Sequence, residues 1–163
     1  MRVGTGYDAH AFDNSGQPRP LVLGGVTIAG APGLAGRSDA DVVSHAVIDA
    51  LLGAAALGDL GDHFPAQAVP DGVSSLELLR RTQSLLAAAG FRIANVDVTA
   101  VIQDVRVGPH RQEMRSRIAG ALGLDPGAVS VKATTTDRLG FAGRGEGAEA
   151  IAVALVEPAD AGA

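Results

Sequence analysis

The chain has 163 residues, a net charge of −5 and no cysteine, and 47% of its residues are apolar. This length suits one domain with a real core, and the acidic balance argues against the broad basic surface that nucleic-acid binding usually needs. Without cysteine, disulfides and thiolate metal sites are excluded, so any metal has to be held by histidine and carboxylate.

The chain contains no stretch of about 20 unbroken apolar residues, so we expect no membrane span. Its first residues lack the long apolar run of a signal peptide, and we therefore expect a cytoplasmic protein. No repeat or break in composition marks a second domain. We expect residues 1–157 to form a single catalytic domain and residues 158–163 to be a loose tail.

The first element predicted in chain order is a strand at residues 2–8, and a loop follows at residues 14–20. Gly24 and Gly25 then separate two short apolar runs, which is typical of a β-hairpin. Further strands are predicted at residues 93–103, 129–135 and 148–156. The last of these is rich in alanine and could be a helix on propensity, but we interpret it as a strand.

Three helices have recognisable start and stop signals. A serine followed three residues later by an acidic residue resembles a capping box and predicts the start of the first two, and a proline predicts the start of the third. A glycine marks the end of each. These helices should run from about Ser38 to Gly58, from Ser74 to Gly90 and from Pro109 to Gly123.

Strands and helices thus interleave along the chain. We predict an α+β fold with one β-sheet and the helices packed on one face of it. The hairpin, joined to this sheet, should make it mixed.

Asp8 and His10 lie two residues apart on the first strand, so both side chains point to one face and can reach one ion. His45 strengthens this pair, because an imidazole is unusual among the apolar residues of a helix. It could instead be a core histidine bonded to Asp41 or Asp49, four residues away on either side, but a metal-bound histidine also needs such a partner. One aspartate and two histidines would leave an open position on a tetrahedral zinc ion.

The other two histidines, His63 and His110, have no carboxylate at ligand spacing, and we expect them to be structural or solvated. The segment 132–147 combines a lysine, consecutive threonines, an aspartate and several glycines. These groups suit a diphosphate and its divalent metal, although a strand followed by a flexible glycine turn would look similar. Residues 59–62 are either a turn that ends the first helix or a carboxylate that accepts a sugar hydroxyl.

Several segments together resemble the 2-C-methyl-D-erythritol 2,4-cyclodiphosphate synthase family. The resemblance covers nearly the whole chain in the right order. It rests on residues 2–12, 38–41 with His45, 49–61, 95–99 and 133–147.

The resemblance implies that the substrate is 4-diphosphocytidyl-2-C-methyl-D-erythritol 2-phosphate. Its 2-phosphate attacks the β-phosphorus, CMP leaves, and a cyclic diphosphate of the non-mevalonate isoprenoid pathway forms. The attacking oxygen is already anionic, so the enzyme only has to orient the reacting groups and neutralise charge.

The resemblance also assigns roles to residues. It implies one zinc ion per subunit on Asp8, His10 and His45, and a second ion, Mg²⁺ or Mn²⁺, on Asp137. With these four residues, Thr135 completes the expected catalytic set. The residues expected around the substrate are Arg37 and Ser38 for the 2-phosphate, Asp59 and Gly61 for the methylerythritol, and Arg106, Ala133, Thr134 and Thr135 for the cytidine diphosphate. From its spacing, Asp49 is expected to support His45.

Family members are homotrimers with active sites between subunits, so we expect a homotrimer here. Phe141 and Arg144 would border a cavity on the threefold axis that can hold an isoprenoid diphosphate. The chain departs from the family pattern at a few positions. It has Arg37 for histidine, Asp137 for glutamate, Ala66 for aspartate, and Val105-Arg106 for proline-lysine.

Two other functions fit part of the pattern. The first is a zinc hydrolase that uses metal-bound water on phosphate esters and gives a product without a ring. The second is a non-catalytic trimer that senses isoprenoid diphosphates, which would bind ligand without releasing CMP.

Overall fold

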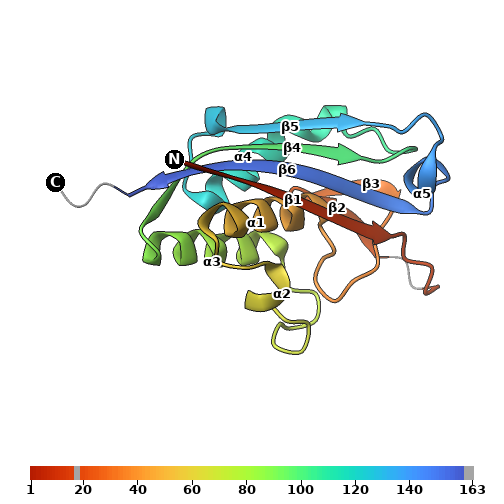
Figure 1. The fold of residues 1–163 in the computed structure, drawn as a ribbon. Helices are drawn as coiled ribbons and strands as arrows, with labels where there is room; N and C mark the ends of the chain where they lie inside the picture. The colour runs from red at the N-terminus through yellow and green to blue at the C-terminus, as the bar shows by residue number, and fades with distance from the viewer. Residues whose placement is uncertain (17–18, 160–163) are drawn as a thin grey trace.

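A four-stranded mixed sheet forms one layer of the molecule (Figure 1). The structure is a computed structural model that describes residues 1–16 and 19–159. The strand order is β1-β6-β4-β5, with antiparallel pairing of β1 with β6 and of β6 with β4, and parallel pairing of β4 with β5. The strands are β1 (Arg2–Ala11), β4 (Phe91–Val101), β5 (Val129–Thr134) and β6 (Gly147–Pro158).

The predicted hairpin forms, but it does not join this sheet. Its strands, β2 (Pro20–Leu23) and β3 (Val26–Pro32), pair only with each other in a separate two-stranded sheet. The prediction that the hairpin makes the main sheet mixed was therefore wrong. The sheet is mixed because the chain crosses over through a helix between β4 and β5, which makes these two strands parallel.

The long helices α1 (Val42–Ala55), α3 (Ser75–Ala88) and α4 (Arg111–Leu122) lie on one side of the sheet (Figure 1). This confirms the predicted α+β arrangement. Short helical elements lie between the long helices and the strands. These are the single-turn helices α2 (Leu60–His63) and α5 (Gly140–Gly143), and the 3₁₀ turns η1 (Gly108–His110) and η2 (Pro126–Ala128).

Helix α1 lies directly on β1 because two glycines face it. A Cβ atom on Gly4 would overlap the carbonyl oxygen of Ala50, and one on Gly6 would overlap that of Ala46. The neighbouring strand β6 also presents small side chains to the helices, since its buried positions are mostly alanine. This close approach places the first turns of α1 beside the carboxyl-terminal half of β1.

Helix α1 begins later than its sequence signal indicated. Its N-cap is Asp41, whose carboxylate accepts hydrogen bonds from the backbone N–H groups of Val43 and Ser44. The same carboxylate accepts from the N–H groups of Gly24 and Gly25 at 2.8 and 2.6 Å, which ties the hairpin to the helix. Ser38 was predicted to cap the helix, but its hydroxyl instead accepts from the N–H of Ala40.

Helix α3 begins at the predicted place by a different device. Ser74 is the N-cap residue, but its side chain makes no capping bond, and Glu77 pairs with Arg80 and Arg81 instead. The carboxylate of Asp39, far back in the sequence, accepts a hydrogen bond of 2.9 Å from the N–H of Ser75. A tertiary contact therefore replaces the local capping box.

The predicted loop and the predicted tail each overlap with a strand, and Pro20, the last residue of the loop, begins β2. Pro158 is the last residue of β6, and the N–H of Ala159 donates to the carbonyl of Gly90 at 2.7 Å. The rest of the predicted tail, residues 160–163, lies outside the described residues, as do residues 17–18 of the predicted loop. Within the described parts of the chain, no helix is both long and apolar enough to cross a membrane.

The face of the sheet opposite the helices carries exposed apolar side chains. Val3 is 66% exposed, Tyr7 53%, Ile151 50% and Val153 40%. These four residues lie on β1 and β6 and are called the outer face below. The described part of the chain leaves this face open to the surroundings.

Candidate metal centre and active site

Asp8, His10 and His45 meet where β1 lies against α1. Oδ2 of Asp8 lies 2.9 Å from Nε2 of His10 and 2.9 Å from Nδ1 of His45. The two ring nitrogens are 3.2 Å apart. Among the described residues, these three form a cluster with the geometry to hold a metal ion. The structure thus brings together the three residues that the sequence predicted as ligands.

The spacing of these donor atoms fits a tetrahedral zinc ion. Ligands about 2.0–2.1 Å from such an ion lie about 3.3 Å from one another, close to the observed separations. The donors are one carboxylate oxygen and two imidazole nitrogens, which is a set that zinc accepts. The side chains of Asp8 and His10 are 25% and 20% exposed, so the cluster has an open side toward solvent.

The two histidines determine the charge state of Asp8. Burial alone would raise the pKa of this carboxyl, but hydrogen bonds from His10 and His45 outweigh burial and lower it well below its usual range. The hydrogen bond with Asp8 in turn raises the pKa of His10. The carboxylate is therefore ionised and available as a ligand near neutral pH.

Each histidine has a partner on the nitrogen that faces away from the cluster. Nδ1 of His10 lies 2.7 Å from the carbonyl oxygen of Ala35, which can only accept, so Nδ1 carries a hydrogen, and Nε2, which hydrogen-bonds to Asp8 in the absence of a metal, is the nitrogen left to bind one. Nε2 of His45 lies 3.0 Å from the hydroxyl of Ser75 and 3.2 Å from that of Ser38.

Asp49, expected to support His45, does not do so. Its Oδ1 accepts a hydrogen bond of 2.8 Å from the N–H of Leu60 and so anchors the start of α2 to α1. Asp41, the other carboxylate one turn from His45, caps the helix. The spacing argument failed because both carboxylates are occupied by backbone N–H groups, and serine hydroxyls lie beside the imidazole instead.

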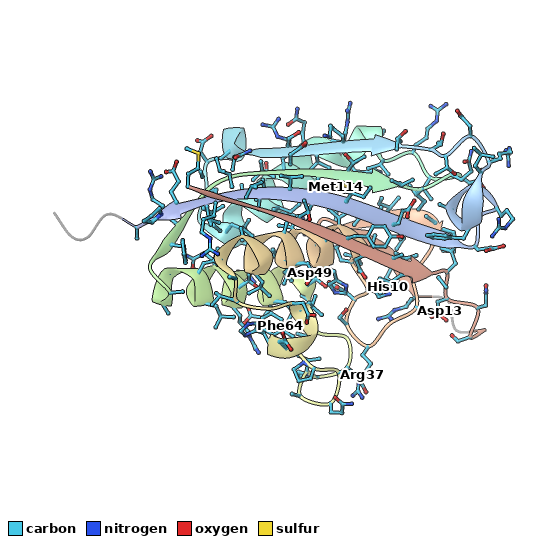
Figure 2. All side chains as sticks on the ribbon, viewed as in Figure 1. His10, Asp13, Arg37, Asp49, Phe64 and Met114 are labelled. Atoms are coloured by element: carbon cyan, nitrogen blue, oxygen red, sulfur yellow. The ribbon has the colours of Figure 1, made fainter. Side chains whose placement is uncertain are left out.

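The cluster opens into a cavity of about 520 Å³. Figure 2 shows His10, Arg37, Asp49 and Phe64 on different elements around it. Of the residues predicted to bind metal or substrate, those that line it are Asp8, His10, Arg37, Ser38, His45, Asp59 and Gly61. Arg19 supports the wall that carries Arg37 and Ser38, because its guanidinium donates to backbone carbonyls of the segment 34–38.

Residues 59–62 do not form the turn ending the first helix that was one of the two alternatives considered from the sequence. Asp59 is the N-cap of helix α2 and forms a capping box with Asp62, so the segment starts a new helix rather than ending α1. Oδ1 of Asp59 accepts the N–H of Asp62 at 3.0 Å. The capping box holds Asp59 at the cavity wall.

The remaining predicted residues lie outside this cavity, on the end of β5, the segment after it, α5 and the loop after β4. Thr134, Thr135 and Asp137 are exposed, and Asp137 has a left-handed backbone with a φ of 51°. Arg106 lines another cavity, of about 530 Å³, with His110. Arg144 pairs with Glu146 at 2.7 Å. This second group consists of Arg106, Ala133, Thr134, Thr135, Asp137, Phe141 and Arg144.

Some residues of the site were not predicted. Phe64, Val69 and Leu78 supply the apolar part of the cavity wall, and Ser75 contacts His45 from α3. Only the serine pair at the start of α3 gave a signal, and it pointed to Ser74 as a cap. His63 was expected to be structural, and its Nε2 lies 2.7 Å from the carbonyl oxygen of Leu57.

The fold and the cluster define a small α+β protein with a half-open candidate site for a metal ion beside a cavity. The family model described as the YgbB family matches residues 1–157, and the chain belongs to this family.

Curated relatives extend this result. The chain is 55% identical over 157 residues to the 2-C-methyl-D-erythritol 2,4-cyclodiphosphate synthase of Syntrophobacter fumaroxidans, covering 96% of this chain and 97% of the relative. It is 52% identical to the synthase of Moorella thermoacetica, covering 100% of this chain and 99% of the relative. These matches confirm the resemblance stated from the sequence.

Solved structures agree with the fold. The structure of the bifunctional IspDF from Campylobacter jejuni matches with a TM-score of 0.91 and 38% identity, and the match covers 96% of this chain but only 42% of that longer one. The IspF of Plasmodium falciparum, solved as a CDP complex, matches with a TM-score of 0.82 and 30% identity over 98% of this chain and 97% of that one.

Proposed function

We propose that this chain converts 4-diphosphocytidyl-2-C-methyl-D-erythritol 2-phosphate to 2-C-methyl-D-erythritol 2,4-cyclodiphosphate and CMP. The observation that carries the proposal is the cluster of Asp8, His10 and His45, which opens into a cavity in a chain 55% identical to a named synthase. The reaction makes the protein a phosphorus–oxygen lyase of isoprenoid biosynthesis. We place it in the cytoplasm, with residues 1–157 as its single catalytic domain.

The reaction is an intramolecular phosphoryl transfer. An oxygen of the 2-phosphate forms a bond to the β-phosphorus, the bond between that phosphorus and the bridging oxygen breaks, and CMP leaves with the α-phosphate. The attacking oxygen is already anionic, so no side-chain nucleophile is needed. The protein has to fold the substrate for in-line attack and to offset its negative charge. In favourable cases, such orientation lowers the activation barrier by about 7–11 kcal/mol.

Asp8, His10 and His45 would hold a zinc ion, one per subunit. A zinc ion held there would supply Lewis acidity toward a phosphoryl oxygen and so offset the charge that develops during the transfer. The Ala35 carbonyl occupies Nδ1 of His10 and leaves Nε2 to bind the ion. We assign a second, substrate-associated ion, Mg²⁺ or Mn²⁺, to Asp137, a hard oxygen ligand on an exposed turn.

The cavity residues would position the half of the substrate that carries the 2-phosphate. Ser38 and Arg37 lie on the wall beside the cluster and suit the 2-phosphate, since arginine stays charged at every physiological pH. Arg37 pairs with Asp71 at 2.7 Å, but both side chains are largely exposed, so the guanidinium remains free to turn to the substrate. Asp59 and Gly61, which also line the cavity, suit the hydroxyls of the methylerythritol.

The other half of the substrate would be bound by a neighbouring subunit. The second group of residues, assigned to the cytidine diphosphate, does not line the cavity that holds the metal cluster. A homotrimer with active sites between subunits would join the two groups. The exposed apolar side chains of the outer face support such an assembly, because monomers seldom leave a sheet face of this kind uncovered. Phe141 and Arg144 would then border a central cavity able to hold an isoprenoid diphosphate.

The proposal is tested by incubating the purified protein with the substrate, Zn²⁺ and Mg²⁺ and following phosphorus NMR. We expect CMP together with the paired signals of a cyclic diphosphate, and we expect His45→Ala to be inactive. CMP with an open-chain bisphosphate would instead indicate the zinc hydrolase. Substrate binding without any release of CMP would indicate the non-catalytic binding protein and direct attention to Arg37, Ala66 and Val105.

A further inference from the structure

Behind His45, on the side away from the cavity, a buried hydroxyl and a carboxylate follow one another. Oγ of Ser75 lies 3.0 Å from Nε2 of His45, and Ser75 is fully buried. The same hydroxyl also hydrogen-bonds to Oδ1 of Asp39. Three residues from three segments, the loop before α1, α1 itself and the first residue of α3, are therefore connected in a line.

The chemistry of these groups fixes the direction of the hydrogen bonds. An ionised carboxylate can only accept, so the single hydroxyl hydrogen of Ser75 points to Asp39. The lone pairs on the Ser75 oxygen then face Nε2 of His45, which has to donate. With Nε2 occupied as a donor, Nδ1 is the nitrogen of His45 left to bind a metal, and it lies 2.9 Å from Asp8.

Asp39 is itself held firmly. Its Oδ2 accepts the N–H of Ser75 at 2.9 Å, so the carboxylate contacts both the backbone and the side chain of the same residue. The N–H of Asp39 donates to the carbonyl of Val73 at 3.0 Å. These bonds restrict the rotamers of Asp39 and Ser75, and the hydroxyl is thereby fixed in place beside the imidazole.

Ser38 differs from Ser75 although both hydroxyls lie near Nε2 of His45. Ser38 lines the cavity and accepts the N–H of Ala40, which leaves its own hydrogen free to turn toward a ligand in the cavity. Ser75 is not part of the cavity wall, and its hydrogen is bound to Asp39.

We infer that Ser75 and Asp39 are positioning residues that hold His45 in the tautomer and ring orientation needed to bind metal through Nδ1. This inference rests on the proposed function, since it needs a metal ion on the cluster. The backbone carbonyl of Ala35 fixes the tautomer of His10 in the same way, whereas the tautomer of His45 depends on side chains. Partners of this kind typically change metal affinity by about 10–100-fold when they are removed.

The test compares zinc affinity in Ser75→Ala, Asp39→Asn and the wild type, measured by competition with a chelating dye. We expect zinc binding to weaken about tenfold or more in both variants, and Ser75→Thr, which keeps the hydroxyl, to restore most of it. In the zinc-loaded wild type, the Nε2–H of His45 should give a slowly exchanging NMR signal that Ser75→Ala loses.

Ser44→Ala is the matched control. Ser44 is also fully buried, and its hydroxyl also donates to an aspartate, Asp41, at 2.7 Å, but it does not touch an imidazole. It should lose comparable stability and keep its zinc affinity. If Ser75→Ala and Asp39→Asn bind zinc as tightly as Ser44→Ala, the positioning role is wrong although the metal site stands. If the wild type itself binds no zinc, the proposed metal centre is wrong and the inference falls with it.

Discussion

Nε2 of His10 and Nδ1 of His45 lie 3.2 Å apart, although 35 residues separate the two histidines in the sequence. One belongs to a strand and the other to a helix, so their distance depends on how closely α1 packs on β1. Two ring nitrogens at this distance, with the Asp8 carboxylate 2.9 Å from each, suit a shared cation. The histidine pair therefore links the packing of the fold to metal binding.

The first prediction concerns the effect of zinc on stability. A ligand that binds only the folded state at about 100 times its dissociation constant stabilises that state by about 2.7 kcal/mol. We expect zinc to raise the free energy of unfolding of the wild type by about this amount in urea denaturation, and to leave His10→Ala unchanged. His110→Ala, which removes a histidine outside the cluster, should keep the full zinc effect. Equal stabilisation of His10→Ala would show that zinc binds elsewhere.

The second prediction concerns the glycine that lets α1 approach β1. Gly6→Ala places a methyl group against the carbonyl oxygen of Ala46, and we expect a loss of about 1–3 kcal/mol in the free energy of unfolding. Zinc affinity should fall as well, because the strand and the helix each carry ligands.

The control for that experiment is the same substitution on an exposed helix. Gly120, on α4, has open space where a Cβ would lie, so Gly120→Ala should gain about 0.5–1 kcal/mol. Denaturation curves of the two variants should thus shift in opposite directions. A Gly6→Ala protein as stable as the wild type would refute the close packing of α1 on β1.

The third prediction concerns Tyr7, the only tyrosine in a chain that has no tryptophan. Its hydroxyl donates to Glu149 at 2.7 Å, and this bond, with partial burial and the nearby charges of Glu149 and Asp8, raises the pKa of Tyr7 above its ordinary value of about 10. The folded state then holds the phenolic proton more tightly than the unfolded state. The resulting stability is present below about pH 10 and is lost as the pH rises through the folded-state pKa.

Ultraviolet titration of the phenolate measures this pKa directly. We expect Glu149→Gln to lower the Tyr7 pKa toward its ordinary value, and Glu146→Gln, which disturbs only the pair with Arg144, to leave it in place. An unchanged titration in Glu149→Gln would mean that the hydrogen bond has no effect on the phenol.

The fourth prediction concerns the outer face and the proposed trimer. Ile151 is half exposed there, and replacing it by aspartate would bury a charge in any interface formed on this face. We expect the wild type to sediment at equilibrium as a trimer and Ile151→Asp to dissociate. Ser84→Asp, on the exposed side of α3, should remain a trimer. A monomeric wild type would contradict the assembly, and a trimeric Ile151→Asp would place the interface elsewhere.

The sequence predicted the long elements and the cluster of Asp8, His10 and His45 well, because each depends on local signals. Asp8 and His10 share a face of a strand, and His45 interrupts an apolar helix, so each could be recognised without knowledge of the fold. Residues 148–156 were also interpreted as a strand although their helix propensity is high, and β6 confirms this. The roles of individual residues toward the substrate came from the resemblance and not from these patterns.

The failures have two physical causes, which are competition among neighbouring polar groups and contacts between residues distant in the sequence. Ser38 looked like a helix cap, but its hydroxyl bonds to Ala40 and lies beside His45, while Asp41 caps the helix. Asp49 looked like the partner of His45, but the N–H of Leu60 occupies it. Ser75 could not be assigned to His45 at all, because 30 residues separate them and only tertiary packing brings them together.

The division of the predicted site residues into two groups has a consequence for how the protein would work in solution. On the proposed assembly, each chain carries two unfinished halves, one with the metal cluster and one with the nucleotide residues, and neither works alone. Dilution would then inhibit the enzyme, and specific activity would rise with protein concentration until the trimer is complete. Chains damaged in opposite halves, such as His45→Ala and Thr135→Ala, could restore each other when mixed, since one pairing in a mixed ring joins two intact halves.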